Sequence, residues 1–197
     1  MATAIRNASP IHFGPFPVTT QVFHLTRYSY ALVNLKPILP GHVLVSPRRG
    51  VPRVADLTPP EASDLFLTVR RVARMVERVY GASSLNIAIQ DGVDAGQSVP
   101  HVHAHVIPRK KLDLEARGGV DAVYELLEGE EGDLGRILSE KPGDGTGVVE
   151  GKGENGGRRR RFPKVDDEDR RPRSLEEMEQ EARFLMAEME MEKEGDE

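Results

Sequence analysis

The amino-acid sequence predicts an α+β fold, a mostly antiparallel β-sheet with a long covering helix and a C-terminal helix. Three observations predict it. Several short apolar segments are separated by turns that contain Gly or Pro, as the strands of a sheet are. One capped segment carries apolar residues at helical spacing over a long stretch. A second capped segment with the same spacing lies near the end of the 197 residues.

Five strands are predicted from the apolar segments. Residues 37–41 (PILPG) predict the turn between the second strand and the third, and Pro108 is expected to end the last one. The strands are predicted at residues 22–25, 28–34, 42–46, 84–90 and 101–107.

The long helix is marked at both ends. Thr58 is expected to be its N-cap, Pro59 suits the first helical position, and Glu61 completes a capping box with Thr58. Gly81 is expected to end the helix as a C-cap. The apolar residues between these ends recur in steps of three and four, so they would form one continuous face. They are Ala62, Leu65, Phe66, Val69, Val72, Ala73, Val76, Val79 and Tyr80.

The C-terminal helix is predicted from Ser174 and Glu177, which form a second capping box. Apolar residues follow at helical spacing, and this stripe could dock on the rest of the domain. They are Met178, Ala182, Leu185 and Met189.

The composition changes after Leu127. Residues 1–127 hold 14 Lys and Arg against 10 Asp and Glu, whereas residues 128–197 hold 13 against 22. Residues 129–157 hold 10 of the 19 Gly and few large apolar residues, so this stretch cannot bury enough surface to offset its chain entropy. We therefore expect a domain over 1–127, a disordered Gly-rich and charged insert over 128–173, the C-terminal helix over 174–191 and a tail over 192–197.

Several classes of protein are excluded or disfavoured. Cysteine is absent, which excludes disulfides, a cysteine-liganded zinc site and a cysteine nucleophile. No apolar run approaches the roughly 20 residues that cross a bilayer, and residues 1–10 lack the apolar region of a secretory signal. We expect no membrane partner and a cytoplasmic location, and the basic run 158–161 would also permit a nuclear one. We do not expect nucleic acid as a partner, because a linker with charges of both signs explains that run more simply.

The segment 101–107 (HVHAHVI) indicates the chemistry. Side chains alternate between the two faces of a strand, so His101, His103 and His105 would share one face. Such a row could ligate zinc or copper, could form a structural cluster, or could transfer a phosphoryl or nucleotidyl group. Imidazole suits the last reaction because much of it is neutral and nucleophilic near pH 7.

The flanking residues favour group transfer. The loop 91–99 (DGVDAGQSV) offers small residues, backbone N–H groups, an amide and a hydroxyl, which can hold phosphate oxygens closely. Arg109, Lys110 and Lys111 follow the strand and add positive potential. We therefore predict a ligand that contains phosphate.

The motif HVHAHVIP resembles the pattern His-φ-His-φ-His-φ-φ of the histidine triad (HIT) superfamily, where φ is apolar. The segments QDG, AGQ and HVHAHVIPRK over residues 90–110 resemble its fragile histidine triad branch more specifically than PGHVLV at 40–45 does. The resemblance covers about residues 11–127, and residues 174–189 resemble the C-terminal helix of that branch. It implies a HIT-like fold and a hydrolase that cleaves diadenosine triphosphate and related dinucleoside polyphosphates to AMP and ADP through a covalent nucleotidyl-histidine.

The resemblance also implies roles for the histidines. His103, the middle one, corresponds to the nucleophile that attacks the α-phosphorus. His105 would lie near the phosphate and the bridging oxygen and reduce the negative charge that develops there. His101 and His42 would orient His103 and fix its tautomer. From its position in the sequence alone, His42 would more often be a satisfied core histidine.

The substrate-binding residues follow from the same resemblance. The phosphate-contacting loop corresponds to Gly96, Gln97, Ser98 and Val99. The polar contacts on the ribose and phosphate side correspond to Asn34 and Gln90, and the residues that pack an adenine base correspond to Phe13, Leu32 and Leu44. The three apolar residues could instead be ordinary core, and Asn34 before a turn could serve the turn.

The family also implies partners. We expect a homodimer with a sheet that continues across the interface, and a divalent cation, Mg²⁺ or Mn²⁺, that arrives with the polyphosphate and not in a cage of protein ligands. Two alternatives stay open. One is a nucleoside phosphoramidate hydrolase of the same superfamily, and the other is a nucleotide-dependent binding or signalling module with slow turnover.

Overall fold

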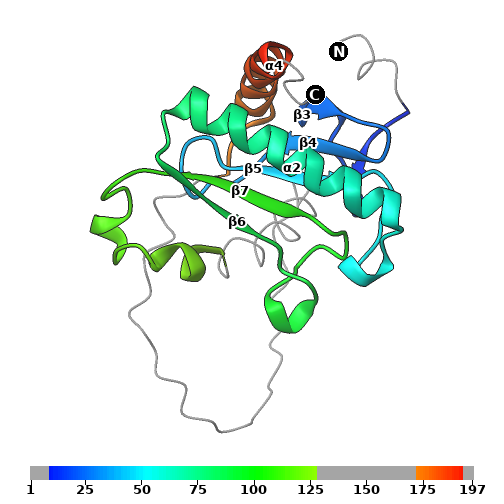
Figure 1. Cartoon of the computed structure of the whole chain (residues 1–197), viewed down its shortest axis with the longest axis horizontal. Coiled ribbons are helices and arrows are strands. Elements are labelled where there is room, and N and C mark those ends of the chain that lie inside the picture. Colours follow the sequence, from blue (N-terminus) through cyan, green and yellow to red (C-terminus); the bar gives the residue numbers. More distant parts are fainter. Residues whose placement is uncertain (1–8, 128–171, 193–197) are drawn as a thin grey trace, which may run out of the picture.

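The computed structural model describes residues 9–127 and 172–192, and its main sheet has five strands. Each strand is antiparallel to its neighbours, and their order is β3-β4-β5-β7-β6 (Figure 1). The strands are β3 (Val22–Leu25), β4 (Ser29–Val33), β5 (Val43–Pro47), β6 (Ser84–Ala88) and β7 (Ala104–Arg109). The predicted α+β fold with a mostly antiparallel sheet is therefore confirmed.

Smaller elements complete the domain. A separate hairpin pairs β1 (His12–Phe13) with β2 (Phe16–Pro17). Single 3-10 turns occupy η1 (Thr19–Gln21), η2 (Val54–Asp56), η3 (Val93–Ala95) and η4 (Glu115–Arg117). The insert predicted over 128–173 lies outside the described residues, apart from Pro172 and Arg173.

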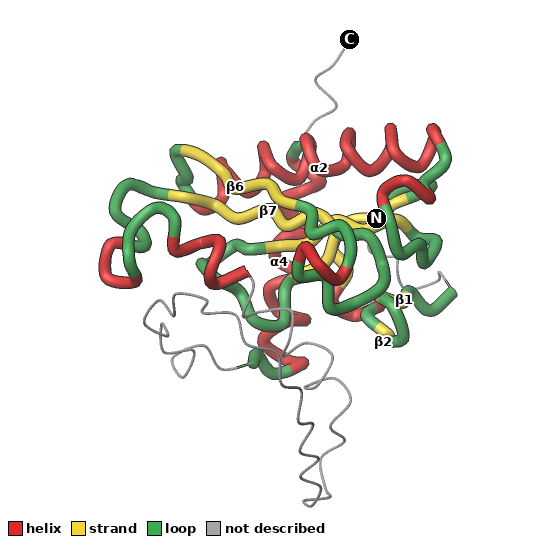
Figure 2. Tube along the Cα trace, turned by 90° about the horizontal axis from the view of Figure 1, so that it is seen from below, coloured by secondary structure: helices red, strands yellow, loops and turns green. Residues whose placement is uncertain are grey.

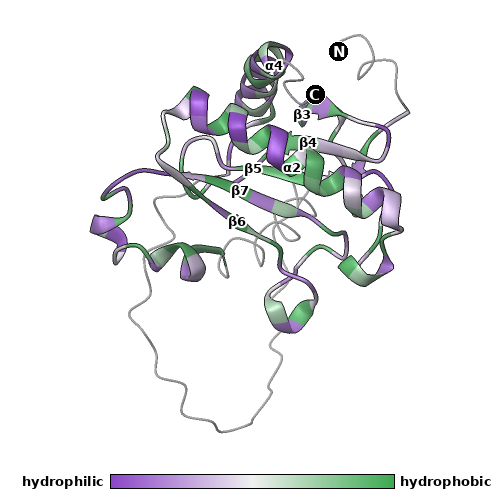
Figure 3. Ribbon diagram, in the orientation of Figure 1, coloured by the Kyte–Doolittle hydropathy of each residue, from purple (hydrophilic) through white to green (hydrophobic). Residues whose placement is uncertain are grey.

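Helix α2 (Pro59–Tyr80) lies along one face of the sheet (Figure 2). Thr58 and Glu61 form the predicted capping box, and Gly81 ends the helix in the left-handed conformation with φ +57°. Hydrophobic and hydrophilic stretches alternate along the helix (Figure 3), and the buried side packs on the sheet. Phe66, predicted to face the core, is 53% exposed, and Met75 is buried in the core instead.

Helix α4 (Leu175–Met191) starts at the predicted capping box of Ser174 and Glu177. It contacts β3, β4 and α2 beside the β3 edge of the sheet (Figure 1). The four residues of the predicted stripe are all buried in the main core: Met178, Ala182, Leu185 and Met189. No helix among the described residues has the length and apolar character needed to span a bilayer.

The last strand differs from its prediction at both ends. β7 begins at Ala104, and Pro108 lies inside it, opposite Leu85 of β6. Pro108 is tolerated because the β5 side of β7 is already unpaired beyond Val106, so the missing N–H breaks no ladder there.

The segment before β7 is held outside the ladder. Its backbone is fixed by the neighbouring loop and strand, because the Val102 N–H donates to the carbonyl of Val51 at 2.7 Å and Ser46 Oγ donates to the carbonyl of Val102 at 2.7 Å. The expectation that strand alternation alone places three histidines on one face is therefore wrong for His101 and His103. Only His105 lies within the strand.

Candidate active site

The structure nevertheless brings four histidines together at the start of β7. His42, His101, His103 and His105 are all at most 3% exposed. The ring centroids of His103 and His105 are 4.9 Å apart, and those of His42 and His105 are 5.2 Å apart. His42 is the residue before β5. Because β5 pairs with β7, the sheet brings His42 next to the histidines at the start of β7.

The tautomer of His103 follows from one backbone contact. Its Nδ1 lies 2.9 Å from the carbonyl oxygen of His101. A carbonyl oxygen can only accept a hydrogen bond, so Nδ1 must carry the proton. The neutral ring then has its basic lone pair on Nε2, which is the form required of a nucleophile or base.

His101 is also fixed by backbone groups, on both of its ring nitrogens. Its Nε2 donates to the carbonyl oxygen of Pro47 at 2.8 Å, and its Nδ1 accepts from the Gly14 N–H at 3.0 Å. Burial lowers the pKa of His101, which keeps this ring neutral. Gly14 is required in the β1–β2 turn because its φ is +55° and a Cβ there would lie 2.6 Å from Val99.

His42 and His105 form a hydrogen-bonded pair, which we call the His42–His105 relay. The Ile38 N–H donates to His42 Nδ1 at 3.2 Å, so the proton of neutral His42 is on Nε2. That nitrogen lies 3.0 Å from His105 Nδ1, to which it donates. Neutral His105 therefore carries its own proton on Nε2 and can donate a hydrogen bond from that side.

Asn34 is next to this relay and also serves the turn. Its Oδ1 accepts the Lys36 N–H at 2.9 Å, which fixes the orientation of the amide. Its Nδ2 is 3.4 Å from His42 Nε2, but both nitrogens then carry N–H groups, so this approach is not a hydrogen bond. The turn role of Asn34 is thus observed, and its contact with substrate stays a prediction.

Of the three residues expected to pack a base, Phe13 lies against the histidines, and Leu44 is opposite His105 in the β5–β7 pair. Phe13, Leu32 and Leu44 belong to one buried apolar cluster together with Val99. The Phe13 ring is 5.0 Å from the ring of His103 and 5.6 Å from that of His101. In the structure these side chains form core, and base packing stays a prediction.

The loop after β6 is held by its own amides. Gln97 Oε1 accepts the Gly92 N–H at 3.0 Å, and its Nε2 donates to the Pro52 carbonyl at 2.9 Å, so this side chain ties the loop to the η2 region. Gly96 has φ +93°, and a Cβ there would come 2.4 Å from Gln90 Nε2. Ser98 is exposed, and Gln90 Oε1 is a buried oxygen with no hydrogen-bond partner among the described residues.

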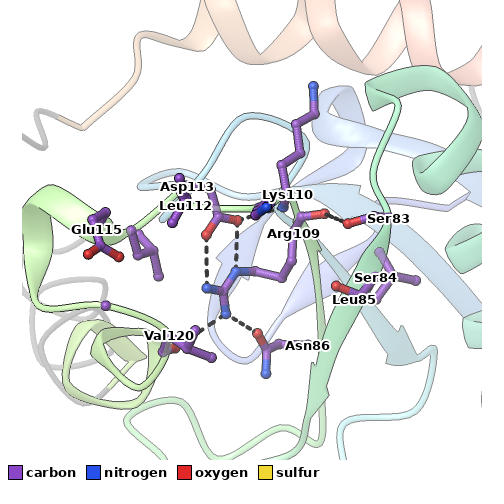
Figure 4. Close-up of a pocket in the computed structure, with 13 residues that line it drawn as sticks. Ser83, Ser84, Leu85, Asn86, Arg109, Lys110, Leu112, Asp113, Glu115 and Val120 are labelled. Atoms are coloured by element: carbon purple, nitrogen blue, oxygen red, sulfur yellow. Dashed lines mark hydrogen bonds and ion pairs between the residues drawn. The ribbon is translucent and has the colours of Figure 1, made fainter.

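Of the three basic residues expected to add positive potential, Arg109 is already engaged in an ion pair. Arg109 lies at the opposite end of β7 from the histidines, in a pocket of about 410 Å³ (Figure 4). Its guanidinium bonds both oxygens of Asp113 at 2.9 Å and also bonds Asn86. The four residue steps from His105 to Arg109, at about 3.3 Å each, place about 13 Å of strand between Arg109 and the histidines.

Sequence reasoning found the four histidines but missed the groups that fix their protons. These are backbone atoms of Gly14, Ile38, Pro47 and His101, and a backbone carbonyl or N–H leaves no signature in a sequence. Within residues 9–127 and 172–192, no group of three or more His, Asp or Glu side chains is arranged to hold a metal ion.

Three comparisons relate the chain to known proteins. Residues 17–112 match the model of the HIT domain. The chain is 53% identical over 178 residues to the bis(5'-nucleosyl)-tetraphosphatase [asymmetrical] of Schizosaccharomyces pombe, which covers 89% of this chain and 92% of the relative. It is 51% identical over 127 residues to the bifunctional bis(5'-adenosyl)-triphosphatase/adenylylsulfatase of Arabidopsis thaliana, with 64% of this chain and 69% of the relative covered.

A solved structure is also similar. The Plasmodium falciparum diadenosine triphosphate hydrolase superposes with a TM-score of 0.53 at 33% identity. The match covers 68% of this chain and 90% of that one.

Proposed function

The chain belongs to the histidine triad (HIT) family, and on this premise we propose that it is a hydrolase of dinucleoside polyphosphates with a histidine nucleophile. Its reference substrate is diadenosine triphosphate, which it splits into AMP and ADP. One observation carries the proposal. The His103 Nδ1–H donates to the carbonyl of His101 at 2.9 Å, so the lone pair of the ring lies on Nε2.

The first step is a displacement at phosphorus. His103 Nε2 attacks the α-phosphorus, an N–P bond forms, and the bond from that phosphorus to the bridging oxygen breaks. ADP leaves with the electron pair of the broken bond, and AMP stays on the histidine. Covalent catalysis of this kind divides one difficult displacement into two easier ones.

The relay supports both steps. His105 donates from Nε2 to a phosphate or bridging oxygen, because its Nδ1 is occupied by His42 at 3.0 Å. This hydrogen bond offsets the negative charge that develops on the oxygen. In the second step water attacks the same phosphorus and releases a proton to solvent, the N–P bond breaks, AMP leaves, and His103 regains its lone pair.

Substrate contacts are proposed for the surrounding residues. A base packed against Phe13, Leu32 and Leu44 would bring the α-phosphate toward His103, because the rings of Phe13 and His103 are 5.0 Å apart. The ribose and phosphate side would contact Asn34 and Gln90, whose buried Oε1 has no partner among the described residues. The phosphates would contact Gly96, Gln97, Ser98 and Val99.

A dimer and a cation complete the proposal. β6 is an edge strand of the sheet, and its Ile87 is 49% exposed, which suits pairing with β6 of a second copy. We propose that Mg²⁺ or Mn²⁺ enters on the polyphosphate as part of the substrate. We also propose a cytoplasmic location, and the basic run 158–161 would permit a nuclear one as well. We propose no membrane partner and no nucleic-acid partner.

The test uses one preparation and three substrates. Diadenosine triphosphate should give AMP plus ADP, diadenosine tetraphosphate should give AMP plus ATP, and an adenosine phosphoramidate should be cleaved more slowly. Quenching with radiolabelled substrate should trap AMP on a peptide that contains residue 103. A large preference for the phosphoramidate, or tight binding without turnover, would overturn the proposal.

A further inference from the structure

The connection between β4 and β5, residues 34–42, carries two site residues and is mostly buried. Asn34 stands at its start and His42 at its end. Buried connections are uncommon, because their backbone polar groups need partners that water would otherwise supply. One of those partners is Arg173, which follows residues 128–171 in the sequence.

We propose that Arg173 is a positioning residue for the His42–His105 relay, an inference that rests on the function proposed above. Arg173 precedes α4 and reaches the start of the connection. Its backbone N–H donates to the carbonyl of Leu35 at 3.0 Å. Its Nε donates to the carbonyl of Asn34 at 3.0 Å, and its Nη2 donates to the same oxygen.

Arg173 is itself held in place. Its Nη1 pairs with Glu181 of α4, and the side chains of both residues are less than 20% exposed. The other oxygen of Glu181 accepts from the Tyr80 hydroxyl of α2 at 2.9 Å. The guanidinium therefore has a fixed direction, and its hydrogen bonds to the connection are not those of a mobile surface side chain.

The same cluster reaches the end of the connection. The Tyr80 ring packs on Gly41, where φ is +86° and a Cβ would lie 2.5 Å from Tyr80 Cδ2. Gly41 directly precedes His42. Arg173, Glu181 and Tyr80 thus form a clamp on both ends of residues 34–42.

The clamp acts on the tautomer of His42. The Ile38 N–H, in the middle of the connection, is the group that keeps the His42 proton on Nε2. If the connection moves away, Nδ1 loses that donor and can take the proton itself. His42 then no longer donates to His105, and His105 no longer needs to keep its own proton on Nε2. Arg173 thereby influences the relay without touching substrate.

The experiment compares Arg173→Gln with Arg183→Gln. Arg183 is on the same helix, is 68% exposed and pairs with Glu179 at 3.5 Å, so it is a matched control for loss of one charge. With diadenosine triphosphate as substrate and rates corrected for the folded fraction, Arg173→Gln should lower kcat about 10-fold and change KM less than about twofold. Arg183→Gln should change neither.

A second readout separates positioning from stability. Two-bond ¹⁵N–¹H NMR spectra of histidine-labelled protein should show one Nε2–H tautomer for His42 in the wild type and a mixture in Arg173→Gln. Arg173→Lys should restore part of kcat, because one ammonium can still donate to the Asn34 carbonyl. Unchanged kcat and an unchanged His42 tautomer in folded Arg173→Gln would overturn the inference.

Failure of the inference differs from failure of the function. If the wild type does not hydrolyse any dinucleoside polyphosphate, the proposed function fails. If the wild type is active and Arg173→Gln has the same kcat, only the role of Arg173 fails. If KM rises while kcat stays constant, Arg173 affects substrate binding and the positioning role is wrong.

Discussion

Polar side chains are buried at both ends of the same strand, but their partners differ. At the start of β7, His103 bonds a backbone carbonyl through one nitrogen. At the end of β7, Arg109 bonds Asp113 through two nitrogens and Asn86 through a third. The first end holds imidazoles with backbone partners, and the second holds an ion pair.

This difference explains why one end is suited to chemistry and the other to stability. A neutral imidazole has two nitrogens, and a backbone partner on one of them determines the state of the other. A guanidinium whose donors are bound to a carboxylate has little left for a ligand, and its role is to keep a buried charge compensated. The Arg109 pocket holds about 410 Å³, yet the charge of Arg109 itself is already paired with Asp113.

The largest expected effect tests the histidine end. His103→Asn removes the nucleophilic nitrogen and should lower kcat for diadenosine triphosphate by about 10⁴-fold or more, while substrate still binds. Steady-state kinetics and equilibrium binding measure the two quantities. The control is Lys110→Gln, an exposed residue near the other end of β7, which should keep kcat within about twofold. If His103→Asn keeps more than a few per cent of the wild-type rate, the histidine end of β7 does not carry the chemistry.

The next effect tests the Arg109 end. Asp113→Asn leaves a nearly buried guanidinium without its counter-charge, since the two side chains are 8% and 12% exposed. The free energy of unfolding should fall by about 3 kcal/mol in urea denaturation, with kcat unchanged once the folded fraction is taken into account. A fall in kcat with normal stability would show that this end takes part in the reaction.

The smallest effect concerns acid, which should protonate His24 at a higher pH than it protonates Asp113. Burial, reinforced by Arg71 and opposed by Asp64, lowers the pKa of His24 on β3 from 6.5 to about 4. The unfolded chain therefore binds a proton that the native chain refuses, so stability is full above pH 6.5 and is lost as pH falls toward 4. His24→Leu should remove about 2 kcal/mol of that loss in denaturation curves measured from pH 7 to pH 4.

Asp113 supplies the contrast in the same measurement. Its hydrogen bonds from Arg109 lower the pKa of its carboxyl below 3.8, so its contribution to stability persists above pH 3.8 and is lost only below it. Asp113→Asn should leave the slope between pH 6.5 and 4.5 unchanged. If His24→Leu does not flatten that slope, buried histidines are not what makes the fold sensitive to mild acid.

The fold was predictable where local signals agree. The capping boxes at Thr58 and Ser174 marked the starts of both helices, and the stripe from Met178 to Met189 is buried as predicted. The errors arose where tertiary context decides. Pro108 belongs to β7 because β5 has already ended beside it. Phe66 is exposed, whereas Leu65 and Val69 on the same helix are in the main core.

The residues of the site were predictable, but the ring nitrogen that holds the proton in each histidine was not. The spacing of the three histidines, with the resemblance that it supports, predicted that His42 and the triad share one site. In the structure the rings of His42 and His105 are 5.2 Å apart. Which nitrogen of each ring holds a proton depends on carbonyl and N–H groups of other loops. The contact of Arg173 with Asn34 joins residues 139 positions apart, and no pattern within either segment indicates it.

Helix α4 has a consequence for how the protein is made. Its four buried side chains finish the core beside β3 and α2, and Arg173 leads into it. A ribosome releases the strands of the sheet long before residues 175–191 emerge, at about 5–20 residues per second. During that interval the nascent domain exposes the apolar surface that α4 will cover, so chaperones should engage it, and hydrolytic competence should appear only when translation of that helix is complete.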